Sequence, residues 1–234
     1  MQTSIAVFSR RALRTLTKQK AVIAILALLI LMLFFKTNFY TSYNLLSVLK
    51  DAAVNEIIAF GVTLTVIAAG CDLSVGGVMC LSGIVAIQLM NKGMSMPLSI
   101  SIAVLSGAVV GFINGFLVVQ QKTEAFIITL GTGMLIKGIN QQFTDAHPVS
   151  CTNMEFMKIA NGKVGDVIPN LALYMIVIGL LVYALLRYTS YGRNLYALGG
   201  DYDVAKYSGI NVVTTKGVAF VLSGTLAAVA GVLL

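Results

Sequence analysis

Long apolar runs separated by short polar intervals dominate the pattern of the chain. A helix needs roughly 20 mainly apolar residues to cross a bilayer, or somewhat fewer where flanking side chains reach the interface. We therefore expect an all-α fold, a polytopic transmembrane helix bundle in which residues 1–234 form a single membrane domain. The pattern predicts about seven spans, near residues 21–35, 53–70, 76–90, 98–119, 125–140, 169–187 and 217–234.

Composition excludes a water-soluble globular fold, because 58% of the residues are apolar and only 11% are charged. The formal net charge of +7 is sparse and scattered, which does not fit the clustered basic face that nucleic-acid binding requires. The lipid bilayer is the expected surrounding, and no nucleic-acid partner is indicated. The three cysteines lack metal-ligand spacing, so the sequence indicates no metal site, disulfide framework or cofactor.

Basic residues predict the topology. Five of them precede the first apolar run, and no cleavage site follows it, so we expect a retained first span and a cytoplasmic N-terminus. Seven crossings then place ten basic residues inside, in agreement with the positive-inside rule, namely Arg10, Arg11, Arg14, Lys18, Lys20, Lys122, Arg187, Arg193, Lys206 and Lys216. The other six fall outside, namely Lys36, Lys50, Lys92, Lys137, Lys158 and Lys163. A re-entrant piece within 53–90 would reverse this parity, and we favour seven crossings.

The chain stops at Leu234 inside the apolar run 220–234, with no polar or basic residue after it. A last span without an anchor is unusual. We therefore expect the membrane domain to be incomplete at its C-terminus.

A polar, glycine-flanked segment at 70–77 separates two short apolar runs and predicts a broken helix. Broken helices in transporters expose backbone groups toward a polar path, and an acid there is a candidate functional residue. Asp72, Ser74, Gly76 and Gly77 are therefore candidates for a translocation path or gate. The alternative is that Asp72 or Ser74 only caps the next helix.

Small residues mark two further spans. Gly107, Gly111 and Gly115 share one face of 98–119, where such rows permit close helix packing. Asn114 beside them is expected to hydrogen-bond between helices, and it is kept as a path candidate. Thr129 and Gly131 belong to another small-residue stretch, for which packing is again the alternative to lining a path.

Enzyme motifs are absent from the sequence. It contains no G-x-S-x-G, H-E-x-x-H or Walker A pattern, and no paired carboxylates at helical spacing in a span. We therefore expect a protein that is not an enzyme, and that does not itself hydrolyse ATP through a P-loop.

Four segments carry a resemblance: EIIAFGVTLTVIAAGCDLSVGG at 56–77, AFIITLGTGMLIKGI at 125–139, YGRNLYALGGDYDVAKYSGI at 191–210 and FVLSGTLAAVAGVLL at 220–234. Together they resemble the ribose-type permease family of bacterial ABC importers, whose members continue beyond the point where this chain stops. The resemblance implies a homodimeric channel of the bacterial inner membrane. Such a channel receives a monosaccharide from a periplasmic sugar-binding protein and is driven by a separate ABC ATPase subunit.

By position, the resemblance implies an ATPase-coupling helix at Asp201–Ile210, within a cytoplasmic loop at 188–216. A turn at Gly192–Arg193 and the pair Gly199–Gly200 precede it. The residues themselves fit a short amphipathic helix that is capped by Asp201, carries Ala205 and ends at Ser208 and Gly209. The alternative is an ordinary connecting helix.

Two other functions stay open on sequence grounds. An ion-gradient-driven secondary transporter or channel would place more ionisable groups in its spans, where Asp72 is nearly alone. A non-functional fragment of a permease would also explain the abrupt end. The substrate is not readable from the residues. Ribose, another pentose, a hexose such as allose or galactose, or a small signalling sugar derivative all remain open, and branched-chain amino acids are the less favoured alternative.

Overall fold

The structure, a computed structural model, describes residues 20–35, 38–121, 123–165 and 167–234. It divides into two units, Met1–Val48 and Leu49–Leu234, and each is considered by itself. Several residues used in the topology argument lie outside the described residues, namely Arg10, Arg11, Arg14, Lys18, Lys36 and Lys122. The cytoplasmic placement of the N-terminus therefore stays a prediction.

The first unit holds the helix α2 (Lys20–Phe34), the short 3-10 helix η1 (Asn38–Tyr40) and the start of α3 (Ser42–Ile67). α2 corresponds to the predicted first span. Thr41 precedes α3, and its Oγ1 accepts a hydrogen bond from the Asn44 amide at 3.3 Å. A threonine oxygen in this position satisfies an amide that has no partner within the helix. Separately, the Tyr40 hydroxyl donates to the carbonyl oxygen of Leu29 in α2.

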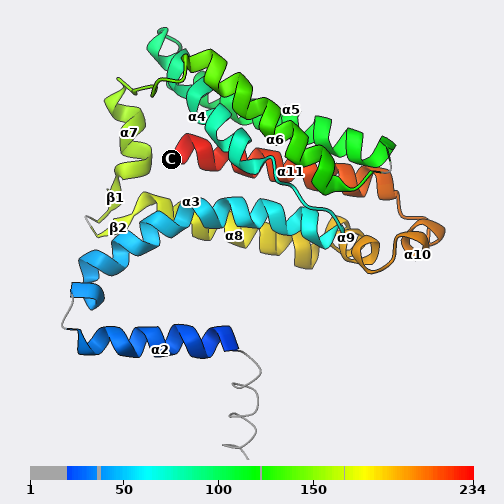
Figure 1. The fold of residues 1–234 in the computed structure, drawn as a ribbon, viewed down its shortest axis with the longest axis horizontal. Coiled ribbons are helices and arrows are strands. Elements are labelled where there is room, and N and C mark those ends of the chain that lie inside the picture. The colour runs from blue at the N-terminus through cyan, green and yellow to red at the C-terminus, as the bar shows by residue number, and fades with distance from the viewer. Residues whose placement is uncertain (1–19, 36–37, 122, 166) are drawn as a thin grey trace, which may run out of the picture. The chain divides into compact units, whose positions relative to one another are not determined.

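The second unit contains the rest of the chain (Figure 1). After α3 come the elements α4 (Val75–Asn91), α5 (Met96–Gln121), α6 (Ala125–Thr144), α7 (Met154–Asn161), β1 (Lys163–Val164), β2 (Ile168–Pro169), α8 (Asn170–Tyr188), α9 (Ser190–Gly200), α10 (Tyr202–Tyr207) and α11 (Val212–Leu233). Figure 1 shows α10 at one end of this unit and α7 with the β1–β2 hairpin at the other.

Each predicted span corresponds to one of these helices, and the all-α membrane fold is confirmed. Among the described residues, α5, α8 and α11 are long and apolar enough to cross a membrane, and Val22–Phe34 and Val75–Asn91 are shorter apolar helices. The number of crossings stays a prediction. Two boundaries were wrong, since α3 begins at Ser42 rather than near residue 53, and α11 begins at Val212 rather than near residue 217.

The polar interval between α6 and α8 contains structure that the sequence analysis did not predict. α7 begins after Asn153, whose side-chain oxygen accepts the amides of Glu155 and Phe156 at 3.0 and 3.2 Å. β1 and β2 then form a two-stranded antiparallel hairpin, in which Lys163 pairs with Pro169. A small β element is therefore an exception to the expected all-α fold.

The core of the second unit forms around α11. Its closest approach is to α5, where a methyl group on Gly111 would overlap the carbonyl oxygen of Phe220, and one on Gly224 would overlap that of Gly107. Only residues without a side chain permit such contact between backbones. The predicted close packing of the glycine row in 98–119 is confirmed. On its other sides α11 packs against α3, α8 and α9 through two apolar clusters.

Candidate functional site

The segment Ala68–Ser74, called the strap below, interrupts the helical path between α3 and α4. The amides of Ala69 and Gly70 bond back to the carbonyls of Val66 and Thr65, at 3.1 and 2.9 Å. This pair of bonds is the Schellman arrangement that closes a helix, with Ala69 in the left-handed position usually taken by glycine (φ 50°). The predicted break is confirmed, but it covers 68–74 rather than 70–77, because α4 begins at Val75 and includes Gly76 and Gly77.

Asp72 is the buried acid of the strap, only 1% exposed. Its Oδ1 accepts hydrogen bonds from the amide and the hydroxyl of Ser74, at 3.0 and 2.6 Å. Its Oδ2 accepts the hydroxyl of Ser223 in α11 at 2.7 Å. A carboxylate with several donors tolerates burial far better than an unpaired one. Asp72 thereby fastens the strap to α11.

The capping alternative for Asp72 and Ser74 was wrong in its usual form. Ser74 is the N-cap residue of α4, but its side chain accepts no amide from the first turn. Asp72 accepts the amide of Ser74 itself, which precedes that turn. The two side chains bond to each other, and neither accepts an unpaired amide of the first turn of α4.

Asn114 joins this arrangement from α5. Its Nδ2 donates to Ser74 Oγ at 2.8 Å, so the expected interhelical hydrogen bond is confirmed. Its Oδ1 is buried and has no hydrogen-bond partner among the described residues. Asp72, Ser74, Asn114 and Ser223, called the Asp72 network below, are all buried. Among the described residues, the only ion pair joins Lys158 and Glu155. No basic side chain of this part of the chain therefore pairs with Asp72.

Thr129 holds the strap from α6. Its Oγ1 accepts the amide of Leu73 at 3.1 Å and lies 2.9 Å from the carbonyl oxygens of both Cys71 and Ala125. The side chain is fully buried. One hydroxyl can donate once and accept twice, so Thr129 satisfies backbone groups of the strap that have no helical partner.

A cavity of about 630 Å³ lies between α4 and α6 and extends to the chain segment after α6. Of the seven path candidates, Gly76 and Gly77 line it. The structure buries four others beside it, namely Asp72, Ser74, Asn114 and Thr129. Gly131 is exposed on α6, outside the cavity lining.

The sequence analysis missed the polar stripe of α6 that faces this cavity, which consists of Lys137, Asn140, Gln141 and Thr144. Their spacing of three and four residues places them on one helix face, and this was the available signal. Asn140 Nδ2 donates to the carbonyl oxygen of Gly77 at 3.1 Å, and its Oδ1 is buried without a partner. The stripe thus bonds α6 directly to the glycine wall of α4.

The segment expected to couple to an ATPase forms the short helix α10. Oδ1 of Asp201 accepts the amides of Asp203 and Val204, both at 2.9 Å, so the expected cap is confirmed. Ala205 is 2% exposed, and Gly209 follows the helix with φ 83°. These values match the expected geometry of a short, capped helix with one inward face.

The expected turn at Gly192–Arg193 was wrong, because these two residues belong to α9, as do Gly199 and Gly200. A methyl on Gly192 would overlap the carbonyl oxygen of Leu186, and one on Gly199 would overlap that of Ile67. These glycines therefore permit close contact with α8 and α3 instead of breaking the helix. Burial raises the pKa of Tyr191, so its hydroxyl stays protonated and donates to the carbonyl oxygen of Thr215 at 3.3 Å.

Comparison with known proteins gives the chain a family. Residues 44–234 match the family described as branched-chain amino acid transport system / permease component. The ribose import permease protein RbsC of Haemophilus influenzae is 35% identical over 94% of this chain and 69% of its own length. The galactose/methyl galactoside import permease protein MglC of Escherichia coli is 31% identical over 98% of this chain and 74% of its own length.

The D-allose transport system permease protein AlsC of Escherichia coli is also similar, with 36% identity over 83% of this chain and 60% of its own length. No solved structure shows a significant match. The match to the family covers nearly all of α3 and every element after it. The chain therefore belongs to this family of transport-system permease components, and its resemblance to the ribose-type permeases is confirmed.

Proposed function

We propose that this chain is the membrane-spanning permease subunit of an ATP-binding cassette importer, and that it carries a monosaccharide from the periplasm into the cytoplasm. The observation that carries the proposal is the similarity over 83% to 98% of the chain to permeases whose names specify ribose, allose and galactose. The substrate is then ribose or a related pentose or hexose. The subunit works as a homodimer in the inner membrane, with a periplasmic sugar-binding protein and a separate ATPase.

The cavity between α4 and α6 is the proposed sugar path. Its volume of about 630 Å³ falls in the range of about 300–1,000 Å³ typical of small-molecule sites. Polar side chains on α6 offer hydrogen bonds to sugar hydroxyls, and Gly76 and Gly77 keep the opposite wall open. The Asp72 network and Thr129 fix that wall from behind. Gly131 lies outside the lining of this cavity and is left out of the proposed path.

The helix α10 is the proposed docking element for the ATPase, within a cytoplasmic loop at 188–216. Ala205 packs inward, while Tyr202, Val204 and Tyr207 are exposed by 48%, 63% and 86%. Exposed aromatic and apolar groups on a short helix suit insertion into a groove of a partner. Gly192, Arg193, Asp201, Ser208 and Gly209 support this element from α9 and from both of its ends.

The test is purification of the tagged chain in mild detergent with its partners, followed by reconstitution in vesicles. We expect an ATPase and a sugar-binding protein to copurify, and ATP to drive uptake of ribose, allose or galactose. Recovery of neither partner, or uptake driven by an ion gradient without ATP, would overturn the proposal.

Ala205→Glu tests the docking element. The buried charge should displace α10 and abolish uptake while the chain still inserts in the membrane. Val164→Glu in the exposed strand β1 is the matched control and should leave uptake unchanged. Normal uptake by the Ala205 variant would contradict the assignment of α10.

A further inference from the structure

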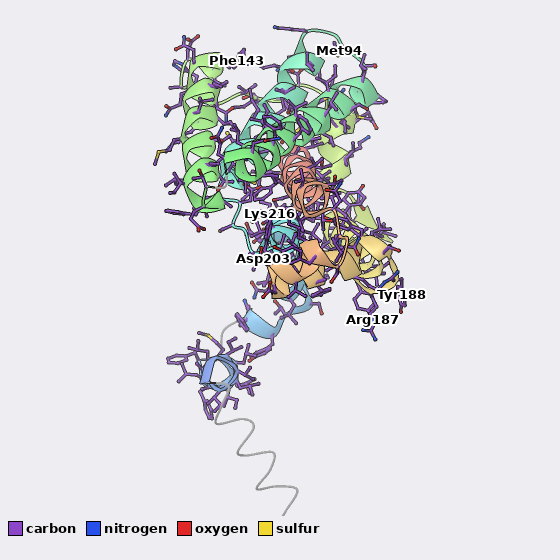
Figure 2. All side chains as sticks on the ribbon, turned by 90° about the vertical axis from the view of Figure 1, so that its right-hand side faces the viewer. Met94, Phe143, Arg187, Tyr188, Asp203 and Lys216 are labelled. Carbon is purple, nitrogen blue, oxygen red and sulfur yellow. The ribbon has the colours of Figure 1, made fainter. Side chains whose placement is uncertain are left out.

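A second cavity, of about 450 Å³, lies at the α10 end of the unit. It is bounded by α10, the connection between α5 and α6, the first turns of α11 and Ala69 of the strap. Lys216 of α11 lines this cavity together with Asp203 of α10, and both are labelled in Figure 2. The element proposed to meet the ATPase therefore shares a cavity wall with the segment that interrupts the helices.

Lys216 makes the one side-chain hydrogen bond between this wall and the strap that the described residues contain. Its Nζ donates to the carbonyl oxygen of Ala69 at 3.2 Å. Ala69 is the left-handed residue that closes α3, and its carbonyl lies beyond the helix. A lysine at the C-terminal end of a helix is stabilised by the helix dipole as well as by the hydrogen bond.

An apolar cluster connects the same two places. Ala205 of α10 packs in one cluster with Leu64 near the end of α3 and Ala68 at the start of the strap, together with residues of α9 and α11. A displacement of α10 therefore acts on the α3 end of the strap through packed side chains. Close-packed groups of this kind transmit displacement because they have little free volume.

The other end of the strap reaches the sugar cavity. Leu73 lines that cavity, and its amide is held by Thr129 of α6. The next residues along the chain, through Gly77, form the α4 wall. The strap thus runs from the α10 cavity, where Lys216 bonds it, to the wall of the sugar cavity, where Thr129 and the Asp72 network bond it.

The two fastenings differ in burial. Asp72 is fully enclosed, and breaking its bonds would leave unpaired buried groups. Lys216 is partly exposed at a polar cavity, so water can replace either partner when the bond opens. The Lys216 bond is therefore the one that can open and close during a transport cycle.

Resting on the proposed function, we propose that Lys216 is a positioning residue, which holds the α3 end of the strap and passes the displacement of α10 to the wall of the sugar cavity. Its bond to Ala69 O is closed in one state of the cycle and open in the other. The Asp72 network keeps the far end of the strap in register throughout.

The test uses the importer complex purified through this chain and reconstituted in vesicles. Lys216→Met removes the ammonium group but keeps an unbranched side chain, and Lys216→Arg keeps the charge and the donors. Lys163→Met in the exposed strand β1 is the control for the loss of a lysine. Two quantities are measured: sugar molecules carried per ATP hydrolysed, and the reaction rate of Cys80 with a thiol reagent, with and without a non-hydrolysable ATP analogue.

Cys80 is a suitable reporter because it is exposed and lines the sugar cavity. Cys71 and Cys151 are replaced by serine so that labelling is specific. We expect Lys216→Met to hydrolyse ATP at the wild-type rate, to lower the sugar-to-ATP ratio about tenfold, and to lose the effect of the nucleotide on Cys80 labelling. Lys216→Arg and Lys163→Met should keep the wild-type sugar-to-ATP ratio and the wild-type effect of the nucleotide on Cys80 labelling.

A wild-type ratio and a wild-type nucleotide effect in Lys216→Met would overturn the inference. The inference would also be overturned if Lys163→Met lowered the sugar-to-ATP ratio and lost the nucleotide effect on Cys80 labelling. Losing a lysine elsewhere would then have the same result, without any bond to Ala69. The labelling readout needs only nucleotide binding, so it also reports on a variant whose transport is slow. Absence of ATP-driven sugar uptake in the wild-type complex would instead overturn the proposed function, and this inference with it.

Discussion

At the seam between α5 and α11, glycines bring two backbones together so closely that a methyl on Gly111 would overlap the carbonyl oxygen of Phe220. At the face between α4 and α6, glycines are also frequent, but the backbones approach less closely and a cavity lies beside them. A methyl on Gly77 would lie 3.1 Å from the carbonyl oxygen of Gly133, a tight contact rather than an overlap. A methyl on Gly76, or on Gly131 on the exposed face of α6, would meet nothing within 4 Å. The same residue type closes one interface and leaves room at the other.

This difference separates a fixed part of the molecule from a movable one. Backbones in direct contact have no side chains that could repack, so α5 and α11 must move together. α6 touches α4 through Ile136, which packs with Val78, and through the hydrogen bond from Asn140 to Gly77, while a cavity lies beside these contacts. A transporter needs both parts: a fixed frame, here α5 and α11, and a wall that shifts against it, here the face between α4 and α6.

The largest effect is expected at the seam. Gly111→Leu should lower the free energy of unfolding by more than about 3 kcal/mol, because a side chain forced between two backbones overpacks the interface. Thermal unfolding of the purified chain in detergent measures it. The matched control is Gly131→Leu on α6, which should unfold close to the wild-type temperature. Equal losses in the two variants would remove the distinction between the interfaces.

Asp72 lies where the frame and the wall meet, and its replacement should have the next largest effect. Asp72→Leu should cost about 3 kcal/mol, because the donors of Ser74 and Ser223 lose their acceptor in a buried place. Asp72→Asn should stay within about 1 kcal/mol of wild type, since Ser223 can accept from the new amide. The same unfolding assay compares the two, and a loss in Asp72→Asn as large as that in Asp72→Leu would show that the charge itself is required.

A smaller effect is expected within the α4–α6 face. Asn140→Leu removes the bond to Gly77 but also removes a buried oxygen that has no partner. These changes offset each other, so stability should fall by less than about 1 kcal/mol. The rate of sugar uptake should nevertheless fall, because the polar stripe of α6 loses a side chain that can hydrogen-bond to the sugar. Unchanged uptake would exclude this part of the cavity from the sugar path.

The smallest effect has the opposite sign. Gly131→Ala should raise the free energy of unfolding by about 0.5 kcal/mol, because alanine fits the open space and favours a helix. Gly111→Ala is its counterpart in the seam and should lower stability. Calorimetry or thermal unfolding of the pair gives both signs in one experiment, and two changes of the same sign would contradict the comparison.

Much of the frame was predictable from local pattern. The apolar runs predicted where the helices lie, and the spacing of Gly107, Gly111 and Gly115 predicted which face of α5 would be packed closely. The polar residues between Gly70 and Gly77 predicted the break. In each case the signal lies within a few residues of the feature, so one sequence suffices to detect it.

Features that depend on distant contacts were not predictable. Ser223 bonds Asp72 across 151 residues of sequence, and nothing near either residue indicates the pairing. The glycines of α9 favour a turn by their own propensity, yet contacts with α3 and α8 make them helical. α7 and the β1–β2 hairpin are short elements in a polar interval, where the apolar pattern is weak. Separating the path candidates into lining and buried residues needed the packed structure.

One hydroxyl has a consequence for hydrogen–deuterium exchange. Thr129, whose own side chain is fully buried, accepts the amide of Leu73, although Leu73 lies outside every helix. An amide exchanges only when its hydrogen bond opens to water. The amide proton of Leu73 should therefore be retained as long as those in the middle of α4. Thr129→Val should release it selectively. Mass spectrometry should then detect slow exchange in this irregular segment of the wild-type chain, at a rate typical of the helical core.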